Sequence, residues 1–265
     1  MKLRVLRLLA VVSVPALVLA ACGGDDAASS STSGAPADEP PLDGDIAVFA
    51  AASLTDAFTE LGTAFESEYE DVSVEFNFGA SSALREQILA GAPADVFASA
   101  NTSNMDQVVD GGAATGPENF ATNQLQIAVP AGNEAGVTGL DDFANADLLI
   151  GLCAAEVPCG EFGREALANA GVAPSVDTNE PDVRSLLTKV EAGDLDAGIV
   201  YVTDVLAAGD AVESIDIPAD ENVIATYPIA ALTGAADADV ADAFVEFVLS
   251  DGGQQVLDTY GFDAP

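Results

Sequence analysis

From Asp45 onward, segments with the pattern of β-strands alternate with segments that have the pattern of helices. Short apolar runs such as Ile46 to Phe49 and Asp95 to Ala98 have the length of buried strands. The run after Ile46 to Phe49 instead repeats its apolar residues at helical spacing, at Leu54, Ala57, Phe58, Leu61 and Phe65. This alternation predicts an α/β fold around a largely parallel sheet.

The first residues of the chain have the features of an export signal. Lys2, Arg4 and Arg7 precede an apolar stretch that is short for a membrane span, and Leu19-Ala20-Ala21-Cys22 follows it. This tetrapeptide resembles a bacterial lipobox. The resemblance implies that residues 1–21 are a lipoprotein signal peptide and that lipidated Cys22 anchors the exported chain to the outer face of the cytoplasmic membrane. An ordinary signal peptide with an accidental cysteine is the alternative.

Residues 22–43 are rich in Ala, Ser, Gly, Asp and Pro and contain almost no large apolar side chain. Such a segment buries too little surface to offset its ordering entropy, so we predict a flexible tether. The remaining residues, 44–265, are enough for one large or two modest lobes.

The chain is strongly acidic, with a formal net charge of -37 and no histidine. Three of its seven basic residues lie in the signal segment, so the exported chain carries a net charge of about -40. This charge argues against nucleic acid and against adhesion to anionic lipid. The absence of histidine removes the commonest general base and the commonest transition-metal ligand.

Cys153 and Cys159 are the only other cysteines after Cys22. In an exported chain, two cysteines six positions apart favour a disulfide. Metal binding is the weaker alternative, because no third or fourth soft ligand is evident.

Several predicted helices begin with polar donors directly after a strand. We place Ser53 at the N-cap of the helix that follows Phe49, and a second serine-opened helix begins at Ser81. Further helix starts lie near Gly160 and Val183. First-turn amides and hydroxyls bind oxyanions, and strand-to-helix junctions of an α/β sheet face one crevice, so the four starts predict an anion site. Ordinary helix capping is the alternative at each serine.

Seven motifs together resemble the molybdate-binding proteins of ABC importers. In chain order they are Ala-Ala-Ser-Leu-Thr-Asp-Ala-Phe (51–58), Gly-Ala-Ser-Ser-Ala-Leu (79–84), Gly-Ala-Pro-Ala-Asp-Val-Phe-Ala-Ser-Ala (91–100), Val-Pro-Cys-Gly (157–160), Pro-Asp-Val-Arg (181–184), Gly-Ile-Val-Tyr (198–201) and Tyr-Gly-Phe (260–262). The resemblance implies a two-lobed, type II periplasmic-binding-protein-like fold with a two-segment hinge and a ligand cleft between the lobes. We assign residues 44–123 and 229–265 to lobe 1 and residues 124–228 to lobe 2.

The resemblance also implies the ligand contacts. Ser53 and Ser81 would each donate a hydroxyl and a backbone amide, Cys159 and Val183 a backbone amide, and Tyr201 a hydroxyl. Cys159 departs from the family, where alanine is common, and Ser82 is the alternative to Ser81. The three arginines of the exported chain are expected to make ion pairs or helix-surface contacts instead of binding the anion.

These expectations describe a receptor and not an enzyme. It would bind molybdate and tungstate, which the sequence does not separate, and would deliver them as a monomer to the transmembrane subunits of an ABC permease. No cofactor is expected, and molybdenum would be bound only as its oxyanion. Receptors for sulfate, another tetrahedral oxyanion or an organic solute are alternatives, as is a hydrolase with Ser53 or Ser81 as nucleophile.

Overall fold

The computed structural model describes residues 42–265. They form one compact unit. The predicted signal peptide, Cys22 and nearly all of the predicted tether lie outside the described residues, so those predictions are untested. Within the described part of the chain, no helix combines the length and the apolar character that crossing a membrane requires.

Nine strands form one sheet in the order β2-β1-β3-β9-β4-β7-β5-β6, with β8 paired to β4. Four of the pairings are parallel and four are antiparallel. The prediction of a largely parallel sheet is therefore wrong. The two strands that join the halves of the sheet, β4 (Glu118–Pro130) and β9 (Ile224–Ala231), make every one of the antiparallel pairings. Strand periodicity in a sequence carries no information on the direction of a partner strand.

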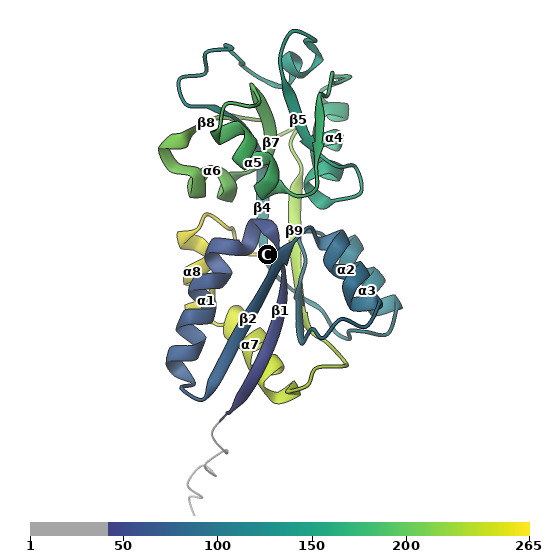
Figure 1. Ribbon diagram of the computed structural model, residues 1–265, viewed down its shortest axis with the longest axis vertical. Coiled ribbons are helices and arrows are strands. Elements are labelled where there is room, and N and C mark those ends of the chain that lie inside the picture. Colours follow the sequence, from purple (N-terminus) through teal and green to yellow (C-terminus); the bar gives the residue numbers. More distant parts are fainter. Residues whose placement is uncertain (1–41) are drawn as a thin grey trace, which may run out of the picture. The chain divides into compact units, whose positions relative to one another are not determined.

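Lobe 1 contains one half of the sheet and five α-helices, the last of which packs mainly on two of the others (Figure 1). Its strands are β1 (Gly44–Ala51), β2 (Val72–Gly79), β3 (Val96–Ala98), β9 and the first half of β4. Its helices are α1 (Thr55–Glu68), α2 (Ser81–Leu89), α3 (Thr102–Asp110), α7 (Ala238–Leu249) and α8 (Asp251–Thr259), and the short 3-10 helix η1 (Ala52–Leu54) precedes α1.

Lobe 2 contains the other half of the sheet and three α-helices. Its strands are the second half of β4, β5 (Ile150–Cys153), β6 (Thr178–Glu180), β7 (Ala197–Tyr201) and β8 (Val212–Asp216). Its helices are α4 (Pro158–Asn169), α5 (Val183–Glu191) and α6 (Val202–Ala208), with two 3-10 helices, η2 (Leu140–Ala144) and η3 (Gly209–Ala211).

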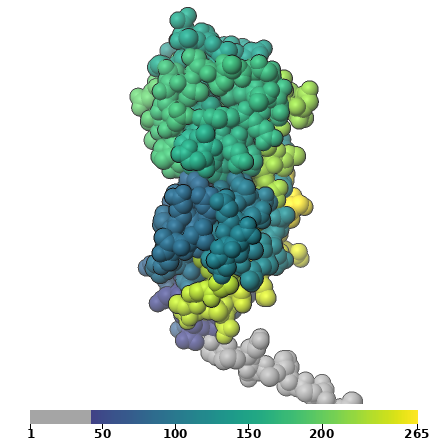
Figure 2. All heavy atoms as spheres, turned by 90° about the vertical axis from the view of Figure 1, so that its right-hand side faces the viewer, coloured from purple at the N-terminus to yellow at the C-terminus, as the bar shows by residue number. Residues whose placement is uncertain are grey.

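Two strands connect the lobes. Up to Gln124, β4 pairs with β9, and from Leu125 onward it pairs with both β7 and β8. Figure 1 shows β4 and β9 running from one lobe to the other, and Figure 2 shows the lobes as a green upper mass and a blue and yellow lower mass. The predicted boundary between residues 123 and 124 lies next to this exchange of partners, whereas the boundary between 228 and 229 lies inside β9, which pairs with lobe 1 strands along its length.

Two glycines lie in the first turn of the last helix. Gly252 and Gly253 follow the start of α8, where Ser250 accepts a hydrogen bond from the Gly253 amide. A Cβ on Gly253 would lie 2.3 Å from the Phe247 carbonyl oxygen. The glycine here therefore permits a close approach between α7 and α8 and does not end a helix.

Candidate functional site

A small cavity lies where strands of both lobes end. Residues that follow β1, β2 and β3 line one side of it, and residues that follow or end β5, β6 and β7 line the other. Because β1 pairs in parallel with β2 and β3, and β5 with β6 and β7, each lobe presents the carboxyl ends of three strands to the same space. All five predicted ligand residues line this cavity: Ser53, Ser81, Cys159, Val183 and Tyr201.

The cavity is small. The space open to the centre of a water molecule is about 20 Å³. Taken as a sphere and widened by the radius of water, about 1.4 Å, this is a hole with a radius of about 3 Å. It has room for one tetrahedral oxyanion and not for a sugar or a peptide.

Ser53 lies in the 3-10 turn between β1 and α1 and is 3% exposed. The prediction that it is an N-cap is wrong, because α1 begins two residues later with Leu54 as its N-cap residue. Its hydroxyl instead lies 3.0 Å from the hydroxyl of Tyr227, a residue of β9. The side chain is therefore held from outside its own helix.

Ser81 is the first residue of α2, with Ala80 as the N-cap residue. Its Oγ accepts a hydrogen bond of 2.9 Å from the backbone N–H of Ala100, which follows β3. Ser82 is also buried, but it does not line the cavity. Neither serine caps α2 with its side chain.

Cys159 is the second residue of α4 and forms a disulfide with Cys153, the last residue of β5. The loop between them is tightly folded, because a Cβ on Gly160 would lie 1.8 Å from the Ala154 carbonyl oxygen. Arg164 also binds this loop, donating to the carbonyl oxygens of Cys153 at 2.7 Å and Gly160 at 2.9 Å. These contacts fix the first turn of α4 and with it the direction of the Cys159 amide.

Val183 is the first residue of α5. Asp182 caps this helix, its carboxylate accepting from the backbone N–H of Ser185 at 2.8 Å and from the Ser185 hydroxyl at 3.0 Å. The side chain of Val183 is buried in the core, so only its amide is available to a ligand. The hydrogen bonds of the described residues include none donated by the amides of Val183, Cys159, Ser53 or Ser81.

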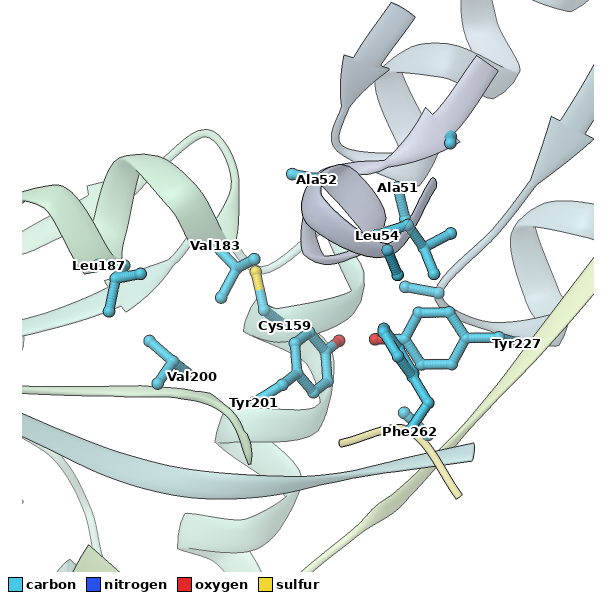
Figure 3. Packing of buried hydrophobic residues seen from close by; sticks show 14 of the residues in the cluster. Ala51, Ala52, Leu54, Cys159, Val183, Leu187, Val200, Tyr201, Tyr227 and Phe262 are labelled. Carbon is cyan, nitrogen blue, oxygen red and sulfur yellow. The ribbon is translucent and has the colours of Figure 1, made fainter. Parts of the chain in front are cut away.

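Tyr201 ends β7 and is the N-cap residue of α6. It is 1% exposed, and its hydroxyl has no hydrogen-bond partner among the described residues. Burial raises the pKa of Tyr201 well above its ordinary value, and the neighbouring Tyr227 raises it further, so the phenol stays protonated. Figure 3 shows the hydroxyl oxygens of the two tyrosines facing each other, beside Cys159 and Val183. A protonated phenol without an acceptor is a donor ready for a ligand.

The charged residues near the cavity are all engaged elsewhere. Asp182 lines the cavity, but its carboxylate caps α5. Arg85 pairs with Glu86, Arg164 holds the disulfide loop, and Arg184 pairs with Asp56 and Asp204. The expectation that the arginines make ion pairs and helix contacts is confirmed. Among the described residues, no group of three or more His, Cys, Asp or Glu side chains is arranged to hold a metal ion.

Two polar contacts join the lobes beside the cavity. Arg184 of α5 pairs with Asp56 of α1 and, through Nε, with Asp204 of α6 at 3.2 Å. On the other side, the Asn101 side chain before α3 donates to Glu161 of α4 at 3.0 Å. The two lobes therefore contact each other on both sides of the cavity.

Known proteins are similar to this chain along nearly its whole length. Residues 46–263 match the family model described as bacterial extracellular solute-binding protein. The molybdate-binding protein ModA of Mycobacterium tuberculosis is 38% identical over 248 residues, which are 93% of each chain. The chain belongs to this family of extracytoplasmic solute-binding proteins. The family resemblance inferred from the seven motifs is thereby confirmed.

One further relative supports the family, and one solved structure supports the fold. The putative ABC transporter substrate-binding lipoprotein YvgL of Bacillus subtilis is 30% identical over 224 residues, covering 83% of this chain and 86% of that protein. The periplasmic molybdate-binding protein of Azotobacter vinelandii shares the fold, with a TM-score of 0.73 at 19% identity over 83% of this chain and 99% of that one. The predicted fold class, a two-lobed α/β fold of type II periplasmic binding proteins, is confirmed.

Sequence reasoning missed the residues that support the cavity from behind. Tyr227 was not singled out, because it lies within β9 and not at a strand-to-helix junction. Ala100 lies at the end of a quoted motif, but nothing in the motif indicates that its amide holds Ser81. Asp204 belongs to α6, a helix that the prediction lacked.

Proposed function

We propose that this protein is an extracytoplasmic receptor that binds molybdate and tungstate and delivers them to an ABC-type permease. The observation that carries the proposal is the cavity's set of donors. Seven are available: a hydroxyl and an amide from each of Ser53 and Ser81, the amides of Cys159 and Val183, and the Tyr201 hydroxyl. The sequence similarity to molybdate-binding proteins supports the same ligand.

Neutral donors explain how so acidic a chain holds an anion. At physiological ionic strength, surface charges farther away than about 8 Å are largely screened, whereas the amides and hydroxyls act at contact distance. A hydrogen bond to a charged acceptor contributes about 1.5 to 3 kcal/mol, so seven donors compensate for the desolvation of a dianion. A cavity that only donates favours an oxyanion without protons and disfavours hydrogen phosphate.

The same geometry supports binding rather than catalysis. A serine nucleophile needs an adjacent base, but Ser53 contacts a tyrosine hydroxyl and Ser81 accepts from a backbone amide. The chain also has no histidine. We therefore propose a receptor without enzymatic activity that works as a monomer and needs no cofactor.

Titration calorimetry of the purified protein with molybdate, tungstate, sulfate and phosphate tests the proposal. We expect tight binding of molybdate and tungstate and much weaker binding of the other two. Strong sulfate binding without molybdate or tungstate binding would instead assign the protein to sulfate.

We also propose that lipid on Cys22 anchors the receptor to the outer face of the cytoplasmic membrane. The lipobox-like sequence supports this, and a relative is described as a lipoprotein. Metabolic labelling with a fatty acid tests it. Label is expected in the wild-type chain and not in Cys22→Ala, and persistent label in the variant would exclude this anchor.

A further inference from the structure

The two serines of the cavity are hydrogen-bonded to different kinds of group. Ser81 accepts from the Ala100 backbone N–H, a group that can only donate. The Ser81 proton is therefore free for the cavity whatever the ligand. Ser53 is paired with the Tyr227 hydroxyl at 3.0 Å, and in this pair either oxygen can be the donor.

The direction of the Ser53–Tyr227 hydrogen bond decides what Ser53 presents to the cavity. If Ser53 donates to Tyr227, its only proton is used there and lone pairs face the ligand. If Tyr227 donates to Ser53, the serine proton is free for the ligand. A dianion in the cavity favours the second arrangement, because an anion needs donors and is repelled by lone pairs.

We propose that Tyr227 is a positioning residue that directs the Ser53 proton into the cavity and so sets the preference for fully deprotonated oxyanions. This inference rests on the proposed function, because it concerns the donors of the same site. Tyr227 does not line the cavity, so it acts through Ser53 and not by contact with the ligand.

The surroundings of Tyr227 suit this role. The residue is completely buried, and burial raises the pKa of its phenol well above the ordinary value, so the hydroxyl keeps its proton. The Asn123 and Tyr201 side chains also face this hydroxyl. Its ring is fixed by edge-on packing against Phe120, Tyr201 and Phe262, with ring centroids 5.4 to 6.2 Å apart. A phenol is also a stronger donor than a serine hydroxyl, which favours the direction from Tyr227 to Ser53.

The test is a double-mutant cycle of Tyr227→Phe and Ser53→Ala, with anion affinities measured by calorimetry. Tyr227→Phe keeps the ring and removes only the hydroxyl. We expect it to weaken molybdate binding about tenfold, as for one misdirected donor. In the Ser53→Ala background, Tyr227→Phe should change affinity by less than about twofold, because its target is gone. An equal loss in both backgrounds, or no loss in the wild-type background, would overturn the proposal.

A second readout separates positioning from general damage to the site. Binding of hydrogen phosphate, which carries a proton of its own, is compared with that of molybdate at mildly alkaline pH. We expect Tyr227→Phe to reduce the ratio of molybdate affinity to hydrogen phosphate affinity. Without the Tyr227 hydroxyl the Ser53 hydroxyl rotates freely, so it can also accept a hydrogen bond from the proton of hydrogen phosphate. Equal weakening for both anions would contradict the proposed role. Tyr260→Phe, which removes an exposed hydroxyl bonded to Glu60, is the matched control and should change neither value.

Two outcomes distinguish failure of this inference from failure of the proposed function. A wild-type protein that binds no molybdate and no tungstate refutes the function before any variant is made. If Tyr227→Phe does not fold, 3-fluorotyrosine placed at position 227 replaces it, since fluorine strengthens the phenol as a donor. Tighter molybdate binding is then expected, and unchanged or weaker binding would overturn the inference.

Discussion

The two walls of the cavity supply their donors in different ways. The lobe 1 wall uses serine hydroxyls that are each hydrogen-bonded to a group outside their own helix, the Tyr227 hydroxyl for Ser53 and the Ala100 backbone N–H for Ser81. The lobe 2 wall relies mainly on backbone amides in the first turns of α4 and α5, at Cys159 and Val183. In lobe 1 the donors that distinguish the wall are side-chain hydroxyls, so they depend on which residue is present. In lobe 2 the donors are mainly backbone amides, so they depend on the backbone conformation.

This difference predicts opposite responses to substitution. Removing a side chain in lobe 1 removes a donor, whereas in lobe 2 the same change leaves the amide in place. The lobe 2 wall accordingly has more restraints on its backbone: a disulfide, a capping aspartate and an arginine that binds the disulfide loop.

The largest effect is expected from the lobe 1 serines. Ser53→Ala and Ser81→Ala should each weaken molybdate binding by about 1 to 3 kcal/mol, one lost donor to a charged acceptor. Ser82→Ala is the matched control, since Ser82 is buried beside Ser81 but does not line the cavity. Calorimetry measures all three. A loss in Ser82→Ala that equals the loss in Ser81→Ala would transfer the hydroxyl role to Ser82.

Val183→Pro removes one backbone donor from the lobe 2 wall. Proline removes the amide proton and is well tolerated at the first position of a helix, and Asp182 before it already has the extended conformation that a following proline requires. We expect molybdate binding to fall about tenfold, one donor lost. Val183→Ala keeps the amide and should change affinity by less than about twofold, although it lowers stability by opening a gap in the core. Equal losses in the two variants would mean that the valine side chain, and not its amide, matters.

The residues that line the cavity were predicted from the sequence better than the residues behind them, Tyr227, Ala100 and Asp204. Strand-to-helix junctions are local patterns, so the positions of Ser53, Ser81 and Val183 follow from short windows of sequence. The family motifs added Tyr201 and Cys159. All five line one cavity because parallel strands place their carboxyl ends at the same edge of the sheet.

The residues behind the cavity wall were missed because their roles depend on contacts between positions far apart in the sequence. Tyr227 is 174 positions from Ser53, and no local pattern connects them. The same limit applies to the fold: β4 and β9 read as ordinary strands, and nothing in their periodicity shows that they run antiparallel to each other or exchange partners between lobes. The N-cap assigned to Ser53 was wrong because a 3-10 turn lengthens the junction before α1.

The disulfide should affect stability more than binding. Replacing both Cys153 and Cys159 by serine releases a short loop, and we expect a cost of about 2 kcal/mol in the free energy of unfolding. Affinity for molybdate should fall only a few-fold, because Arg164 still binds the loop and the Cys159 amide still begins α4. Urea unfolding and calorimetry measure the two effects. A loss of affinity as large as that of Ser53→Ala would show that the disulfide alone aims the amide.

The smallest effect on affinity is expected at Asp204, which lies behind the lobe 2 wall. This buried carboxylate accepts from the Tyr201 backbone N–H at 3.1 Å and pairs with Arg184. Burial raises its pKa to about 6, although Arg184 and the Tyr201 amide oppose the shift, and Asp56 and Asp182 add to it. Asp204→Asn should change molybdate affinity by no more than about twofold, since an amide oxygen still accepts from Tyr201.

Asp204 should instead be visible in the pH dependence of stability. Because its pKa is higher in the folded chain than its ordinary value of 3.8, the folded state holds this proton more tightly than the unfolded state does. Its contribution to the free energy of unfolding is therefore complete below 3.8 and is lost as the pH rises to about 6. Urea unfolding of the wild type and of Asp204→Asn should be measured across this pH range. The free energy of unfolding of the wild type should fall relative to that of the variant as the pH rises, and the difference between the two should be constant at higher pH. The many other carboxylates titrate in both proteins, so parallel curves would mean that Asp204 does not carry a raised pKa.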